Sequence, residues 1–148
     1  MLGPIKITAA PGKHGVPEVT YVLEYDGMTV YFGGDTLLIP ELSEIAECFP
    51  SIDLALLSVN GLRIRPLLNR KVVMDPQEAA ALCRILRPRY AVPIHYAYTG
   101  GPIGDRLLVK HTGTAEAFQQ AAAQVAPETI VRILAPGEPL TIHCLQRV

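Results

Sequence analysis

Residues 19–35 read VTYVLEYDGMTVYFGGD, and this stretch decides the fold class. Two runs rich in β-branched and aromatic residues, Val19–Tyr25 and Met28–Phe32, are separated by Asp26-Gly27. A two-residue Asp-Gly link between such runs favours a primed turn, so the stretch predicts a β-hairpin. The hairpin leads into Gly33-Gly34-Asp35, where the glycines let the backbone turn and bring a carboxylate close to another group.

Periodicity and turn residues predict the elements on either side of this hairpin. Further strands are expected at Leu2–Ala10, Ile52–Val59, Tyr90–His95, Ile130–Leu134 and Leu140–Leu145. Loops are expected at Pro11–Gly15, Asn60–Lys71 and Gly100–Gly113. The sequence therefore predicts an α/β fold, with a mixed β-sheet and helices on one face, as a single domain over residues 1–148.

Three amphipathic helices complete this prediction. The first spans Pro40–Phe49. The second is capped by Asp75, with Glu78 placed to complete a capping box. The third is capped by Thr114. The residues expected on the buried faces of the second and third helices are Ala79, Leu82, Cys83, Leu86, Phe118, Ala121, Ala122 and Val125.

Composition excludes several classes of protein. The chain has 148 residues, 49% of them hydrophobic and 18% charged, and a net charge of −1, which argues against a nucleic-acid partner. No run approaches the roughly 20 apolar residues of a membrane-spanning helix, so we expect no integral membrane segment and a cytoplasmic protein. The cysteines, Cys48, Cys83 and Cys144, form no C-x-x-C pair and are expected to be buried free thiols.

His14, Asp35 and His95 each stand where a predicted strand runs into a loop containing glycine or proline. Each has a structural alternative, because Asp35 can cap a turn, His14 can be a solvated loop residue and His95 a hydrogen-bonded strand end. Taken together, two imidazoles and a carboxylate form a ligand set for divalent zinc, iron or manganese. The strand ends therefore predict a metal site.

Five blocks, in order along the chain, resemble metallo-β-lactamase-fold hydrolases, especially the branch of lactonase-like proteins and N-acyl-phosphatidylethanolamine phospholipase D. The blocks are Ala10–Gly15, Tyr31–Thr36, Ile52–Leu57, Met74–Ala79 and Val92–Tyr96. The resemblance implies that His14 completes one metal site, that Asp35 bridges two metals and that His95 belongs to the second. It also implies catalytic roles for Asp35 and His95, with one or two zinc ions (or manganese or iron) activating water to attack an ester, lactone or phosphodiester in a small-molecule substrate.

The family's H-x-H-x-D-H motif does not occur in these residues. The chain therefore resembles the C-terminal half of the αββα sandwich, and we expect a separate N-terminal half or a homodimer to complete it. The alternative function is a non-catalytic α/β module that pairs with itself or a partner subunit through an exposed sheet face. The high apolar content is consistent with such a face.

Two further histidines and a group of three arginines carry weaker predictions. His111 lies in the loop expected over the site and is a candidate substrate contact, with a solvated loop residue as the alternative. His143 is expected to be structural, in the closing strand. Arg63, Arg65 and Arg70 could bind an anionic group of the substrate, although a solvated loop is the simpler interpretation.

Overall fold

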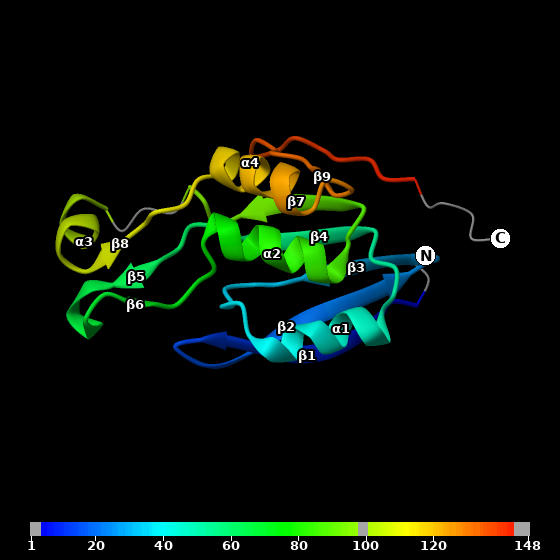
Figure 1. Cartoon of the computed structure of the whole chain (residues 1–148), viewed down its shortest axis with the longest axis horizontal. Helices are drawn as coiled ribbons and strands as arrows, with labels where there is room; N and C mark the ends of the chain where they lie inside the picture. Colours follow the sequence, from blue (N-terminus) through cyan, green and yellow to red (C-terminus); the bar gives the residue numbers. More distant parts are fainter. Residues whose placement is uncertain (1–3, 98–100, 144–148) are drawn as a thin grey trace.

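A computed structural model describes residues 4–97 and 101–143 (Figure 1). A six-stranded mixed sheet has the order β1-β2-β3-β4-β7-β9, and a smaller sheet has the order β6-β5-β8. The strands are β1 (Lys6–His14), β2 (Val16–Tyr25), β3 (Met28–Phe32), β4 (Leu54–Ser58), β5 (Arg63–Ile64), β6 (Arg70–Lys71), β7 (Tyr90–Ile94), β8 (Val109–Lys110) and β9 (Ile130–Val131). The helices are α1 (Ser43–Cys48), α2 (Pro76–Leu86), α3 (Gly101–Leu107) and α4 (Ala115–Val125), with 3-10 turns at Pro40–Leu42 and Arg65–Leu67.

The predicted hairpin and mixed sheet are confirmed. Strands β2 and β3 pair antiparallel, and Asp26 (φ 46°) and Gly27 (φ 75°) both adopt the positive φ of a primed turn. Beyond β3 the pairing is parallel, from β4 through β7 to β9. Parallel neighbours end at the same edge of the sheet, which brings the residues that follow them together.

One face of the large sheet is covered by helices, and the other carries apolar side chains that no helix within residues 4–97 and 101–143 covers (Figure 1). Helices α1, α2 and α4 lie over one face (Figure 1), where Val22, Tyr31, Ala55 and Leu57 are fully buried. The opposite side chains form the open face, which consists of Ile7, Tyr21, Leu23, Val30, Phe32, Leu54 and Leu56. A shallow hollow of about 370 Å³ on this face is lined by Ile7, Tyr21, Leu23, Phe32 and Leu56. Part of the apolar surplus in the sequence therefore lies on this open face.

Helix α2 begins with the predicted capping box. Asp75 Oδ1 accepts a hydrogen bond from the Glu78 backbone N–H at 3.0 Å, and Glu78 Oε2 accepts one from the Asp75 backbone N–H at 3.1 Å. Lys71 Nζ lies 2.7 Å from Asp75 Oδ2 and 2.6 Å from Glu78 Oε1. Burial alone raises the pKa of Asp75, but the hydrogen bonds from Lys71 and from the helix backbone outweigh it and leave this pKa below its ordinary value.

We expect Asp75→Ala to lower the free energy of unfolding by about 1–2 kcal/mol, because it removes the helix cap. Since the folded-state pKa of Asp75 is lowered, its contribution is present above its ordinary pKa and lost as the pH falls through the lowered one. Urea denaturation at several pH values measures both effects. Glu128→Ala, at an exposed position, is the control and should change little; an equal loss in both variants would contradict the prediction.

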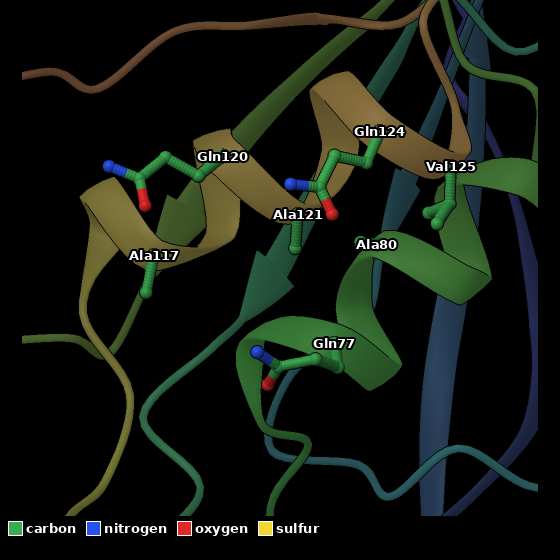
Figure 2. Close-up of a pocket in the computed structure, with 7 residues that line it drawn as sticks. All are labelled: Gln77, Ala80, Ala117, Gln120, Ala121, Gln124 and Val125. Carbon is green, nitrogen blue, oxygen red and sulfur yellow. The ribbon is translucent and has the colours of Figure 1, made fainter.

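Helices α2 and α4 pack through small residues. Figure 2 shows Ala80 of α2 opposite Ala121 of α4, in a groove of about 240 Å³ that Gln77, Gln120 and Gln124 also line. Thr114 caps α4 as predicted, because its Oγ1 accepts from the Ala117 N–H at 3.1 Å. The buried stripe of α4 was predicted one residue too long. Val125 lies at the edge of the groove and is 41% exposed.

Several sequence predictions were wrong in their boundaries. Residues 11–14, expected in a loop, continue β1 to His14, because β1 and β2 form a long antiparallel ribbon whose turn is made at Gly15 (φ 71°). Pro11 fits there because β1 is an edge strand. The expected loops 60–71 and 100–113 contain β5, β6, α3 and β8, although positions 98–100 lie outside the described residues. These short elements form what we call the arm, residues 63–71 and 101–110.

The C-terminal strands and one cysteine also differ from expectation. The strand expected at 130–134 is shortened to β9, and residues 140–143 form no strand, while 144 and 145 lie outside the described residues. Cys83 is buried, and burial raises the pKa of its thiol to about 12. Cys48 is exposed, not buried as predicted, and Cys144 lies outside the described residues. Within the described part of the chain, no helix is both long and apolar enough to cross a bilayer.

Candidate metal centre

The carboxyl ends of β3, β4 and β7 meet at one edge of the large sheet and position the central side chains of the site. Asp35 follows β3, Ser58 ends β4 and His95 directly follows β7. The backbone is turned into the left-handed region at Gly34 (φ 53°) and at His95 (φ 62°). A positive φ is unfavourable for histidine, and such strain concentrates at functional sites.

Asp35 and His95 are in direct contact. Their Oδ1 and Nδ1 atoms lie 3.3 Å apart, and both side chains are partly exposed. The Ser58 hydroxyl, which is buried, lies 3.1 Å from Asp35 Oδ1 and also within hydrogen-bonding distance of the Gly34 carbonyl. The carboxylate is therefore held between the end of β4 and the imidazole that follows β7.

His14 reaches the same region from the end of β1. Its Nδ1 lies 3.0 Å from the Val72 carbonyl oxygen, which can only accept, so Nδ1 carries a proton. In the neutral imidazole the lone pair is then on Nε2, the arrangement typical of metal-binding histidines. The Lys13 N–H donates to Thr36 Oγ1 at 2.9 Å, and the Leu37 N–H donates to the Lys13 carbonyl at 2.8 Å, so β1 is tied to the loop that carries Asp35.

These three side chains line one pocket of about 530 Å³. Its other lining residues are Glu18, Val19, Tyr21, Phe32, Gly34 and Ile94. In the part of the chain that the structure describes, no three His, Cys, Asp or Glu side chains gather closely enough to hold a metal ion. The structure thus brings Asp35 and His95 into contact and places His14 in the same pocket without closing a three-ligand cluster.

Residues 1–96 match the family described as the Beta-lactamase superfamily domain, which is most of the chain. The chain belongs to this superfamily. Two curated relatives named metal-dependent hydrolases support the assignment. The protein from Thermococcus onnurineus is 32% identical over 136 residues, covering 91% of this chain and 51% of the relative. The protein from Nitratidesulfovibrio vulgaris is 31% identical over 142 residues, covering 93% and 52%.

Solved structures of the superfamily show the same fold. A metallo hydrolase from the archaeon Ignicoccus hospitalis matches with a TM-score of 0.71 and 26% identity, covering 97% of this chain and 59% of that one. A metallo-β-lactamase fold protein from Bacillus subtilis matches with a TM-score of 0.63 and 17% identity, covering 90% and 48%. The fold resemblance inferred from the sequence blocks is confirmed. The chain spans about half the length of the curated relatives it matches.

Sequence patterns did not single out two polar residues of the site, Ser58 and Asn60. Ser58 belongs to the predicted apolar strand Ile52–Val59, and Asn60 begins the loop predicted after it. Asn60 is buried, its Nδ2 lies 3.2 Å from His95 Nδ1, and its Oδ1 accepts from the Leu62 N–H at 3.2 Å. The signal that could have found them is the appearance of two polar side chains where a buried parallel strand ends.

His111 and His143 lie away from the pocket. His111 Nε2 is 3.1 Å from Asp105 Oδ1, and neither residue lines the pocket, so a substrate contact by His111 stays a prediction. His143 is not in a strand, and its carbonyl accepts a hydrogen bond from Arg89 at 3.1 Å. The three arginines singled out in the sequence belong to the arm, where Arg65 Nε, for example, donates to the Val109 carbonyl at 3.0 Å.

Proposed function

We propose that this chain forms part of the metal centre of a hydrolase, with His14, Asp35 and His95 as ligands for zinc or for manganese or iron. The contact between Asp35 and His95 at the carboxyl edge of parallel strands carries the proposal. The tautomer of His14, set by the Val72 carbonyl, supports it. The names of the curated relatives as metal-dependent hydrolases agree with it.

A divalent metal in such a centre supplies activated water and polarises the bond to be hydrolysed. The chain's own residues have distinct tasks. Ser58 orients the Asp35 carboxylate, and Asn60 orients the His95 imidazole. Tyr21, Phe32 and Ile94 give the pocket an apolar wall for the part of a small-molecule substrate that does not react. By the resemblance to lactonase-like proteins and the phospholipase D branch, that substrate is an ester, lactone or phosphodiester.

We further propose that residues outside these 148 complete the centre. Three ligands shared between two metal ions are too few for a dinuclear site. Among the described residues, no group of three or more His, Cys, Asp or Glu side chains could hold a metal ion. The open face supports completion by a second layer, because an apolar sheet surface is normally covered. The covering layer corresponds to the half of the relatives that this chain does not span, supplied by the same polypeptide or by a separate subunit.

A second candidate function rests on the open face alone. A non-catalytic module would pair this face with that of another copy, sheet against sheet. The apolar hollow on the face favours such pairing. A dimer that binds no metal would support this candidate over the hydrolase.

Metal analysis of the purified chain tests the main proposal. We expect weak zinc binding that a chelator reverses, and no hydrolysis of esters, lactones or phosphodiesters by the chain alone. A His14→Ala/His95→Ala variant should lose the bound zinc, whereas His111→Ala, outside the pocket, should retain it. Equal zinc binding by all three proteins contradicts the metal centre. Chelator-sensitive turnover by the chain alone contradicts only the proposal that residues outside these 148 complete the metal centre.

A further inference from the structure

The arm has a surface that the metal centre does not use. Its strands β5, β6 and β8 and helix α3 project from one end of the large sheet (Figure 1). Pairing of Arg63 with Lys110 and of Ile64 with Val109 joins its two chain segments. Leu62, Val72 and Val73 form a small core at its base. The arm is therefore a small folded unit whose base is held by packed apolar side chains.

The arm exposes large aliphatic side chains. Leu68 is 97% exposed and lies in the left-handed region (φ 55°), a conformation that glycine or asparagine adopts at lower cost. Its neighbour Leu67 is exposed too, as are Ile103 and Leu107, one turn apart on α3, and Leu108. The Arg65 N–H donates to the Leu108 carbonyl at 2.8 Å, which brings the two apolar groups into one region.

The same segments are strongly basic. Residues 63–71 and 101–110 hold six lysines and arginines against one acidic residue, Asp105, in a chain whose net charge is −1. Lys71 is neutralised at the base of the arm by Asp75 and Glu78. The arm holds five other basic residues, and all but Arg63 are exposed like the aliphatic side chains: Arg63, Arg65, Arg70, Arg106 and Lys110.

We propose that the arm docks on an anionic phospholipid bilayer. Aliphatic side chains enter the boundary between headgroups and acyl chains, while arginines bind the lipid phosphates, and the two attractions act together. A nucleic acid would match the arginines but not the exposed leucines and isoleucine. The proposal concerns a surface separate from the pocket, so it does not depend on the proposed hydrolase function.

Vesicle co-sedimentation of the 148-residue chain tests this docking. We expect binding to phosphatidylcholine vesicles that contain about one third phosphatidylglycerol, weakened by salt, and little binding to pure phosphatidylcholine. Leu68→Ser should weaken binding about tenfold, because the leucine then no longer enters the bilayer. Arg106→Gln should weaken it about fivefold, since each arginine near an anionic surface contributes about 1 kcal/mol. Neither side chain makes a packing contact that the fold needs, as both are exposed.

Matched controls distinguish the arm from the rest of the surface. Ile7→Ser removes an exposed aliphatic side chain from the open face, and Arg84→Gln removes an exposed charge from α2. Both should leave vesicle binding unchanged.

Several outcomes would overturn the proposal. A larger loss of vesicle binding in Ile7→Ser than in Leu68→Ser would favour docking through the open face instead. Equal binding to neutral vesicles, or a lipid-free dimer that Leu68→Ser dissociates, would overturn it as well. The proposal would also be overturned if the chain bound duplex DNA but no vesicles, and if Arg106→Gln weakened that DNA binding.

Discussion

Asp35→Asn is expected to lower the zinc affinity of this chain by about 100-fold or more, because changing even the residues behind metal ligands typically costs 10- to 100-fold. The substitution removes the negative charge beside His95 and leaves a side chain of almost the same size. The amide oxygen can still accept from Ser58, which donates to the carboxylate at 3.1 Å. The loss should therefore appear in metal binding and not in folding.

Competition titration with a zinc-binding dye measures this affinity, and thermal unfolding of the metal-free variant measures the fold. Glu44→Gln, which changes an exposed carboxylate on α1, is the matched control and should bind zinc like the unaltered chain. Zinc affinity that survives in Asp35→Asn would remove Asp35 from the ligand set. A large fall in unfolding temperature would instead assign Asp35 the turn-capping role left open by the sequence.

Local signals predicted the elements whose causes are local. The turn at Asp26-Gly27 and the capping box at Asp75 depend on residues within four positions of one another, and both formed as expected. The continuation of β1 through Pro11 depends instead on pairing with β2, which overrides the turn residues in between. The arm depends on pairing between Arg63 and Lys110, far apart in the sequence, so its short strands left no local pattern.

The residues of the candidate site also differ in whether local sequence signals predict their roles. His14, Asp35 and His95 could be proposed from the ends of predicted strands, because the ends of neighbouring parallel strands meet. The position of Asn60 just after a buried strand is visible in the sequence, but its contact with His95 is not. That contact, like the one between the Val72 carbonyl and His14, depends on which imidazole lies nearby in the folded chain. The separation between His14 and the pair Asp35–His95 is likewise a matter of tertiary arrangement, which residue type does not reveal.

Gly113→Ala is expected to destabilise the chain by about 3 kcal/mol or more, and to lower the unfolding temperature by roughly 10 °C. A Cβ at this position would lie 1.8 Å from the Val59 carbonyl oxygen and 2.8 Å from Pro76 Cδ. Neither neighbour is the far end of a flexible side chain, so the backbone itself must move. Gly104→Ala, where a Cβ would meet nothing within 4 Å, is the control and should leave stability nearly unchanged.

The effect of Gly113→Ala should extend to the metal centre, because the segment that must move is tied to Asn60. The N–H groups of Thr112 and Gly113 both donate to the Asn60 carbonyl, at 3.0 and 2.9 Å, and the Asn60 side chain contacts His95. Zinc affinity measured at a temperature where the variant is still folded should therefore fall. Asp75→Ala should leave it unchanged, because Asp75 hydrogen-bonds to Lys71 and Glu78 and not to Asn60. Equal zinc affinity in the two folded variants would show that Asn60 does not hold His95 in its binding position.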